Sequence, residues 1–275
     1  MILALLASAA SLAATPATIA SVIASAPPGA SIRLAPGDYG VVTIDNRNWA
    51  RPIDLNADGA KLTLNVVRSG GVAVHGGTYV ADTTRPNNGY AIMVRWSHGV
   101  TVDGATVTSA RAGIYVDRST DVKVLRTQIV RVLVDGIDIA SSQRVLVKDS
   151  SCSDFQTEGQ QQHPDCVQMW SNPKFGITQD VTIEHNRSHG PMQGFSGFNH
   201  VTNGVDDGGF DRIVIRDNHA ASTYSHGVAI NACRDCEITG NTAETLPGAR
   251  WRTWVHVVDC TRCRVERNHD GADPR

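Results

Sequence analysis

The chain has 275 residues and a formal net charge of −2. Neither charge sign dominates, so the composition does not indicate a nucleic-acid partner. Hydrophobic residues make up 41% of the sequence, aromatic residues only 5%, and 25 residues are glycine, a balance that favours many short strands and turns over a helical bundle.

The N-terminal segment MILALLASAASLAATPA predicts a signal peptide over residues 1–13. It is an apolar run of the right length, and Ser11 and Ala13 supply small residues for an A-x-A-like cleavage site. No Lys or Arg precedes the run, so a packed or lipid-facing N-terminus is the alternative. Because the run is too short to span a bilayer, we expect a secreted or periplasmic protein without a membrane span.

The next segment predicts a short amphipathic helix over residues 15–26. Thr15 is expected at the N-cap and Pro16 at the first helical position. One face of this helix is apolar and carries Ile19, Val22, Ile23 and Ala26.

From Tyr90 onward the sequence repeats a unit of about 22 residues that contains short apolar strands and turns but no helix. One strand of each unit is expected to begin at Val100, Val122, Val145, Val181, Ile213, Cys236 and Cys263. Asparagine stands five residues after each of the last four starts, at Asn186, Asn218, Asn241 and Asn268. A unit this small cannot bury its own apolar face, so the repeats are expected to stack as a right-handed single-stranded parallel β-helix, an all-β fold, with the asparagines in a ladder.

The opening APPGASIRLAPGDYGVVTI, followed by RPIDLNADGA, resembles the start of pectin-lyase-like β-helix proteins, and the asparagine ladder is similar to theirs. The resemblance implies that the helix over 15–26 caps the open end of one β-helix domain over 27–275. It also implies action on polysaccharides, since that superfamily includes lyases, hydrolases, epimerases and noncatalytic spikes. We expect a monomer.

Aligned repeats bring polar residues of successive units into columns on one outer face. Asp135 and Asp165 fall in one column, and Asp138 and Gln168 in a neighbouring one, so two carboxylates are expected about 5 to 6 Å apart. Carboxylates that close share a proton or bind a cation. Insertions at 152–164, 171–180, 199–212 and 246–254 lengthen the turns that border this face, which predicts a groove.

The groove supplies the candidate site residues. The candidate catalytic residues are Asp135, Asp138, His163, Asp165, Gln168, His226 and Tyr115. The candidate substrate-binding residues, which offer aromatic faces or bidentate guanidinium groups to a sugar acid, are Arg95, Trp170, Gln193, Phe198, Arg250, Trp251 and Arg252. A calcium ion, the one cofactor considered, would be held by Asp135, Asp138 and Asp165.

These residues predict a polysaccharide lyase that acts on a uronate-containing polymer. β-Elimination needs a neutralised uronate carboxylate, a base for the C5 proton and an acid for the leaving oxygen. Related lyases often use Lys or Arg as the base, and Arg95 and Lys148 are the nearest candidates. Glycoside hydrolysis by two carboxylates, C5-epimerisation, suggested by DGID at 135–138 and SHGVAIN at 225–231, and noncatalytic glycan binding stay open.

Six cysteines remain to be placed. The pairs CRDC at 233–236 and CTRC at 260–263 have zinc-site spacing. In the repeat, however, they occupy equivalent positions of successive units, so disulfides between stacked cysteines and free buried thiols are the other possibilities. Cys152 falls at an inward apolar position, and Cys166 takes a place where other units have glycine.

Overall fold

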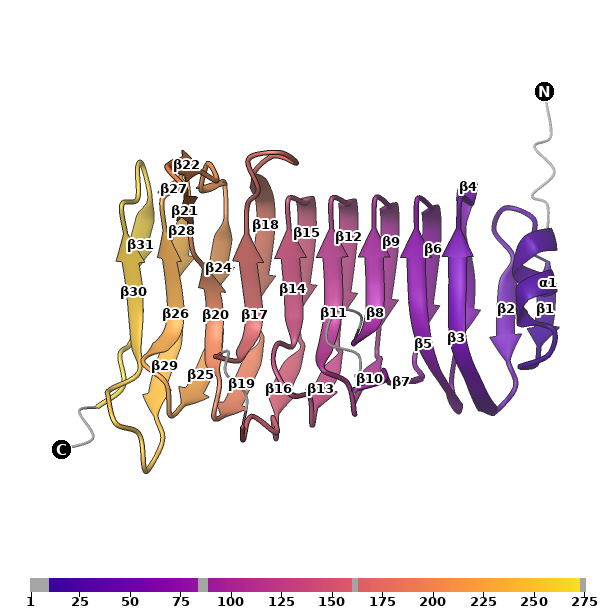
Figure 1. Ribbon diagram of the computed structural model, residues 1–275, viewed down its shortest axis with the longest axis horizontal. Helices are drawn as coiled ribbons and strands as arrows, with labels where there is room; N and C mark the ends of the chain where they lie inside the picture. Colours follow the sequence, from indigo (N-terminus) through magenta and orange to yellow (C-terminus); the bar gives the residue numbers. More distant parts are fainter. Residues whose placement is uncertain (1–9, 84–88, 160–162, 273–275) are drawn as a thin grey trace, which may run out of the picture.

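The computed structural model describes residues 10–83, 89–159 and 163–272. These residues wind into a right-handed parallel β-helix whose coils stack along the long axis of the molecule (Figure 1). Each coil contributes strands to three rows, and the row that faces the viewer in Figure 1 is called the front row. Its outward side, the front face, carries the candidate site.

The front row contains β3 (Gly37–Asp45), β5 (Ala60–Val67), β8 (Tyr90–Arg95), β11 (Ala112–Asp117), β14 (Ile137–Ala140), β17 (Asp165–Trp170), β20 (Gln193–Gly197), β26 (His226–Asn231) and β30 (Trp254–Val258). Its sheet continues, through β5, into a row of shorter strands, β7 (Thr78–Tyr79), β10 (Thr106–Val107), β13 (Gln128–Val130), β16 (Ser151–Ser153), β19 (Arg187–Gly190), β25 (His219–Ser222) and β29 (Thr242–Thr245).

The third row lies at the back of Figure 1 and forms a separate 13-stranded sheet. It contains β1 (Ser11–Ala14), β2 (Ser31–Leu34), β4 (Asn48–Asn56), β6 (Gly70–His75), β9 (His98–Asp103), β12 (Thr120–Leu125), β15 (Gln143–Lys148), β18 (Thr178–Glu184), β24 (Val214–Arg216), β28 (Glu237–Thr239) and β31 (Arg264–Glu266), with the short β23 (Phe210–Asp211) and β27 (Cys233–Arg234) beside them. An antiparallel hairpin, β21 (Val201–Thr202) and β22 (Val205–Asp206), stands apart from both sheets.

The predicted repeat register is confirmed in both long sheets. In the back row Val122 pairs with Val100 and with Val145. In the front row Ile137 pairs with Ile114 and with Val167. Side chains alternate along each strand, so these residues point inward and fill the core while their neighbours point outward.

The asparagine ladder is also present. The side-chain oxygen of Asn218 accepts hydrogen bonds from the backbone and side-chain nitrogens of Asn186, at 2.9 and 3.0 Å. Asn241 receives the same pair of bonds from Asn218, and Asn268 receives them from Asn241. The buried turn amides of these coils therefore find partners inside the turn.

The N-terminal helix is shorter than predicted. Helix α1 spans Ile19–Ser25, its N-cap is Thr18 rather than Thr15, and Ile19 and Ile23 are buried against the first coil. The Thr18 hydroxyl accepts a hydrogen bond from the Thr15 backbone, so residues 15–18 form a turn before the helix begins. In Figure 1, α1 lies at the end of the stack beside β1 and β2, where it covers the first coil as a cap.

The predicted signal peptide is only partly described. Residues 1–9 lie outside the described residues, whereas Ser11–Ala14 forms β1 and pairs with Ser31–Leu34. The cleavage site at Ser11 and Ala13 therefore falls within a paired strand, and cleavage stays a prediction. No helix among the described residues is long and apolar enough to cross a membrane.

All six cysteines are paired in disulfides, within coils rather than between stacked positions. Cys233 bonds to Cys236 and Cys260 to Cys263, so neither C-x-x-C pair is a zinc site. Cys152 bonds to Cys166. Cys166 occupies the position that Gly136 has in the preceding coil. A Cβ added to Gly136 would lie 2.5 Å from the backbone oxygen of Cys166, so that position has no room for a side chain. The side chain of Cys166 turns inward, where it bonds to Cys152.

Candidate active site

Asp135 and Asp165 lie on neighbouring coils, as predicted, and the Asp135 carboxylate contacts the backbone of Asp165. The backbone amide of Asp165 donates a hydrogen bond to Asp135 Oδ1 at 2.9 Å, and the amide of Gly136 donates to the Asp165 backbone oxygen at 2.8 Å. Asp135 lies just before β14 and Asp165 begins β17, so the parallel ladder itself positions these groups. The Asp135 carboxylate is therefore held by a backbone amide of the next coil.

The carboxylate of Asp165 is fully buried and holds two other side chains. Its Oδ2 lies 2.8 Å from His163 Nδ1, and its Oδ1 accepts a hydrogen bond from the Ser196 hydroxyl. His163 enters from the insertion that precedes β17 and keeps about half of its side chain exposed. Asp165 thus fixes the orientation of an imidazole whose other nitrogen is free to face a substrate.

The pKa values of Asp135 and His163 are both raised above their ordinary values. Burial, and then the charge of Asp165, raise the pKa of Asp135 to about 7. The hydrogen bond to Asp165 raises the pKa of His163 above its ordinary value. Asp135 and His163 are both accessible to solvent, so they form a proton-transfer pair on the front face.

Asp138 lies deeper than this pair. It is 2% exposed, its Oδ2 accepts a hydrogen bond of 3.1 Å from the Tyr90 hydroxyl, and its Oδ1 has no hydrogen-bond partner. Burial, and then the charge of Asp135, raise the pKa of Asp138 well above its ordinary value. Burial and the neighbouring carboxylate therefore favour the protonated form of Asp138, which bears less negative charge beneath Asp135.

Calcium binding by Asp135, Asp138 and Asp165 stays a prediction. Among the described residues, no group of three or more His, Cys, Asp or Glu side chains is arranged to hold a metal ion. In the structure Asp135 accepts a hydrogen bond from the Asp165 backbone, Asp165 accepts one from Ser196, and Asp138 accepts one from Tyr90.

Aromatic side chains border the acids toward the N-terminal coils. The Tyr90 ring stacks on Tyr115 with centroids 4.7 Å apart, and Tyr115 stacks on Trp170 at 6.0 Å. Arg95 lies 5.3 Å from the Tyr115 ring and pairs with Asp117 at 2.8 Å. Gln168 is half-buried and pairs in register with Asp138. The predicted residues Tyr115, Trp170, Arg95 and Gln168 thus adjoin the acid group.

A second aromatic group lies toward the C-terminal coils. The His226 ring stacks with Trp254 at 6.3 Å and with His256 at 5.8 Å, and it contacts the tilted ring of Phe198 at 5.3 Å. Burial, and then the nearby His256, lower the pKa of His226. Gln193 pairs in register with Asp165 and so lies between this group and the acids.

Other predicted residues lie away from the acids. Arg250, Trp251 and Arg252 are exposed on the connection between β29 and β30, where Arg252 lies 3.5 Å from Asp270. Lys148 is not on the front face, because it belongs to β15 of the back row and pairs with Glu184 at 2.8 Å. Lys148 therefore cannot act as a base on the front face.

Four contributors were not predicted as site residues: Tyr90, Ser196, Arg111 and His256. Tyr90 and Ser196 do appear in the outward columns of the repeat, which is the signal that could have singled them out. Arg111 lowers the pKa of both Asp135 and Asp138 through its charge, and it precedes β11, where the repeat gives no column. A constant repeat would place Thr253 beside His226, but a register shift between His226 and Val228 brings Trp254 opposite His226.

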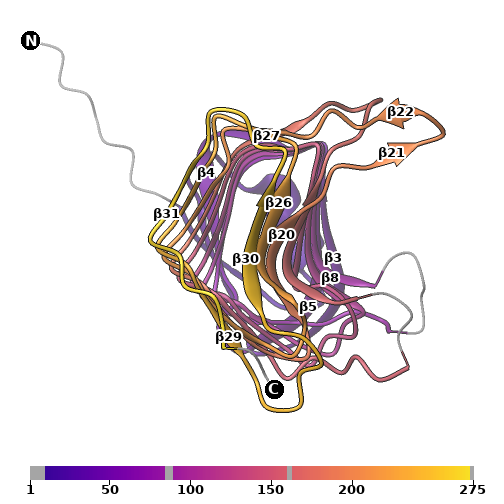
Figure 2. The ribbon, with the colours of Figure 1, turned by 90° about the vertical axis from the view of Figure 1, so that its left-hand side faces the viewer.

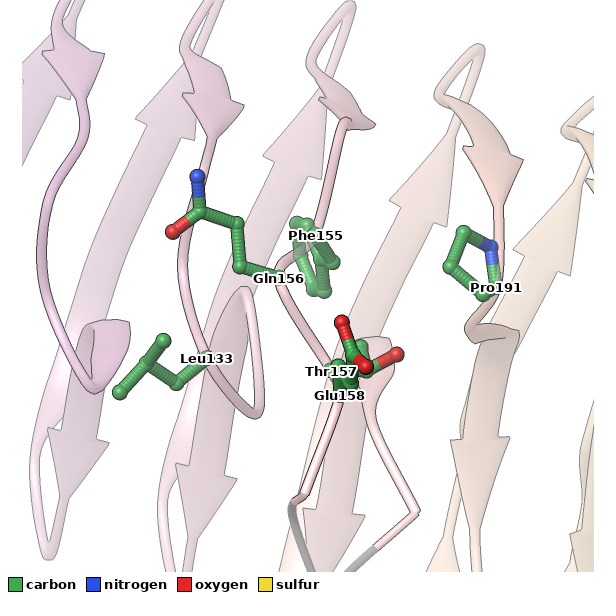
Figure 3. A pocket seen from close by; sticks show the side chains of 6 residues that line it. All are labelled: Leu133, Phe155, Gln156, Thr157, Glu158 and Pro191. Carbon is green, nitrogen blue, oxygen red and sulfur yellow. The ribbon is translucent and has the colours of Figure 1, made fainter.

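The insertions project from both edges of the front face, as Figure 2 shows. The β21–β22 hairpin extends forward from the upper edge, and the connection through residues 155–159 extends from the lower edge. A hollow of about 620 Å³ lies at that lower edge, lined by Leu133, Phe155, Gln156, Thr157, Glu158 and Pro191. Figure 3 shows that these side chains come from three neighbouring coils, just before the strands β14, β17 and β20.

Comparisons with known proteins agree with this architecture. A family model described as a right-handed beta helix region matches residues 37–163. No curated protein matches the sequence. An alginate lyase from Paenibacillus sp. str. FPU-7 superposes with a TM-score of 0.61 at 15% identity, and the match covers 94% of this chain and 99% of that one.

Two further structures show how widely this fold is used. PfbA, a surface adhesin of Streptococcus pneumoniae, superposes with a TM-score of 0.60 at 10% identity over 88% of this chain and 80% of that one. A polygalacturonase from Erwinia carotovora superposes with a TM-score of 0.55 at 13% identity over 95% and 94%. At these identities the likeness establishes the pectin-lyase-like β-helix fold alone.

Proposed function

We propose that this right-handed parallel β-helix is an enzyme that cleaves a polysaccharide by general acid–base catalysis on its front face. One observation carries the proposal: Asp165 contacts both Asp135 and His163, and the pKa of Asp135 is raised to about 7 while the pKa of His163 is raised above its ordinary value. A general acid and a general base work best when their pKa values lie near the working pH.

In the proposed reaction Asp135 is the base and the His163 imidazolium is the acid. Asp135 accepts the C5 proton of a uronate residue, and His163 gives its proton to the glycosidic oxygen as that bond breaks. The raised pKa of Asp138 favours its neutral form, which leaves the floor of the site less negative for an approaching acidic polymer. The stacked rings of Tyr90, Tyr115 and Trp170 provide a platform for adjacent sugars.

Glycoside hydrolysis is the second candidate, and the raised pKa of Asp135 favours it equally. The same carboxylate would then activate a water molecule while His163 protonates the leaving oxygen. The two reactions differ in their products, because elimination leaves an unsaturated sugar and hydrolysis does not.

The test is to incubate the protein with alginate, polygalacturonate and glycosaminoglycans, and to follow both ultraviolet absorbance of unsaturated products and the release of reducing ends. Elimination raises both signals, and hydrolysis raises only the second. Asp135→Asn and His163→Asn should each lower the rate by about 10²-fold or more. His219→Asn is the matched control, since His219 also pairs with a carboxylate, Glu244 at 3.0 Å, but lies on β25.

Unchanged activity in both site variants would place the chemistry elsewhere. Binding of a polymer without any new product would instead identify a noncatalytic glycan-binding protein.

We also propose that the protein is secreted or periplasmic. The three disulfides support this, because such bonds persist in oxidising compartments. Fractionation of cells that express the full chain, followed by mass determination of the mature N-terminus, tests both the location and the cleavage site.

A further inference from the structure

Three polar side chains continue the column of Asp165 toward the C-terminus. Gln193 begins β20, His226 begins β26 and Trp254 begins β30. Asp165 pairs with Gln193, and His226 pairs with Trp254. Between these pairs the register of Phe195 with Val228 brings His226 level with Gln193. The column therefore runs without a gap from the proposed proton-transfer pair to the last front-row strand.

Each of these three side chains has a buried polar atom without a hydrogen-bond partner in the part of the chain that the structure describes: Gln193 Oε1, His226 Nδ1 and Trp254 Nε1. Gln193 is only 8% exposed. Unpaired buried polar atoms cost free energy and are rare in native proteins, so three of them in one column indicate a ligand that completes their hydrogen bonds.

The chemistry of the column fits a sugar without a charge. The stacked rings of His226 and Trp254, with the tilted ring of Phe198 beside them, offer apolar surface to the C–H face of a sugar ring. The Trp254 indole nitrogen donates, the Gln193 amide oxygen accepts, and the His226 ring nitrogen does either, which matches hydroxyl groups. The guanidinium of Arg252, 5.7 Å from the Trp254 ring, is engaged by Asp270.

We propose that Gln193, His226 and Trp254 form a subsite for an uncharged sugar residue. Its place next to the bond that is cleaved rests on the proposed function, whereas the binding itself does not. The polymer would then carry a neutral sugar next to the unit held by Asp135 and His163, in the direction of the protein's C-terminal coils.

The experiment measures binding of neutral gluco-, manno-, xylo- and galacto-oligosaccharides, and of oligouronates, by calorimetry. Trp254→Phe and His226→Phe keep an aromatic ring but remove the polar atom, and His219→Phe on β25 is the matched control. At least one neutral oligosaccharide should bind the unaltered protein. Each site variant should weaken that binding about tenfold, the effect of one lost hydrogen bond, while its melting temperature holds or rises.

Three results would overturn the subsite: no neutral oligosaccharide binds, the two site variants bind as tightly as the unaltered protein, or His219→Phe weakens binding equally. Failure of the proposed function is distinguishable from these. If the protein cleaves no polymer but Trp254→Phe weakens neutral-sugar binding, the subsite is supported and the proposed function is not. If the protein cleaves a polymer but all variants bind neutral sugars equally well, the proposed function is supported and the subsite is not.

Discussion

The backbone amide of Asp165 donates a hydrogen bond of 2.9 Å to the carboxylate of Asp135 in the preceding coil, while the Asp165 carboxylate contacts His163 at 2.8 Å. One residue thus organises two titrating groups through different atoms. A substitution that alters only the side chain of Asp165 keeps the backbone hydrogen bond to Asp135 but removes a charge that acts on both Asp135 and His163.

Asp165→Asn should leave the contact to Asp135 intact and weaken the hold on His163. Because the Asp165 contact raises the pKa of His163, the pKa should fall toward its ordinary value in the variant. His163 then loses its proton at lower pH, so the alkaline limb of the rate profile should move to lower pH and the maximum rate should fall about 10²-fold. The measurements are the pH–rate profile and an NMR titration of His163.

Asp54→Asn is the control for this prediction, since Asp54 lies 3.5 Å from His75 on the back row. An Asp165→Asn protein with native melting temperature and an unmoved alkaline limb would argue against His163 as the acid.

Asp138 should make the protein less stable as the pH rises. In the unfolded chain its carboxyl loses its proton near pH 4, but burial and the charge of Asp135 raise its pKa in the folded protein. The folded state therefore binds more protons above about pH 4, and the free energy of unfolding falls as pH increases. Asp138→Asn should flatten this decline in melting temperature between about pH 4 and pH 7.

Asp121 supplies a control, because its effect on stability should change with pH in the opposite direction. Its hydrogen bond to Arg144 lowers its pKa, so its contribution to stability is present at neutral pH and is lost as pH falls through the folded pKa. Asp121→Asn should destabilise more at pH 7 than at pH 3. Equal pH profiles for the Asp138→Asn and unaltered proteins would show that Asp138 is charged in the native state.

The Cys152–Cys166 disulfide should matter to both stability and activity. It closes a loop with a sequence separation of 14, for which the loss of chain entropy corresponds to about 3 kcal/mol. Cys166 directly follows Asp165, so loosening it should also displace the proton-transfer pair. Urea unfolding of Cys152→Ala/Cys166→Ala should show this loss, and the rate should fall with it.

The control for the disulfide is Cys260→Ala/Cys263→Ala, which opens a short loop in the last coil. Its rate should stay close to that of the unaltered protein. Thiol titration of the denatured, unreduced chain should find no reactive cysteine, and any thiol found would contradict the pairing.

Asn218→Ala should destabilise the stack by about 3 kcal/mol. Asn218 sits in the middle of the ladder, where its oxygen accepts from Asn186 and its side-chain nitrogen donates to Ile183 O and to Asn241, so its loss leaves several buried groups unpaired. Asn268→Ala, at the partly exposed end of the same ladder, should cost only about 1 kcal/mol. Similar losses of unfolding free energy in urea for both variants would contradict a cooperative ladder.

The sequence predicted the columns of this protein because a repeat of constant length fixes which residues stack. The pairing of Asp135, Asp138 and Gln168 with their neighbours follows from counting between apolar anchors such as Ile137 and Val167. The count fails where an insertion changes the coil length. The pairing of β26 with β30 has a register shift between His226 and Val228, and Trp254 rather than Thr253 lies opposite His226.

Orientation within a column was not predictable. Stacking places Asp135 near Asp165, but whether a carboxylate meets another carboxylate or a backbone amide depends on side-chain torsions that leave no trace in the repeat. The same holds for cysteines, since Cys233 and Cys260 stack while their sulfurs turn along the coil to Cys236 and Cys263. His163 lies in an insertion, where no periodicity applied.

The contact between Asp135 and Asp165 involves only two adjacent coils, β14 and β17 with their turns. Outside these two coils, Tyr90 of β8 and Ser196 of β20 contact the acids directly, and coils farther away act only through their neighbours. The length of the molecule is therefore a variable independent of its chemistry: whole coils gained or lost between α1 and β8 would change how much polymer the face can hold without moving the proton-transfer pair. A protein with more coils would contact a longer stretch of substrate, while its catalytic step would stay the same.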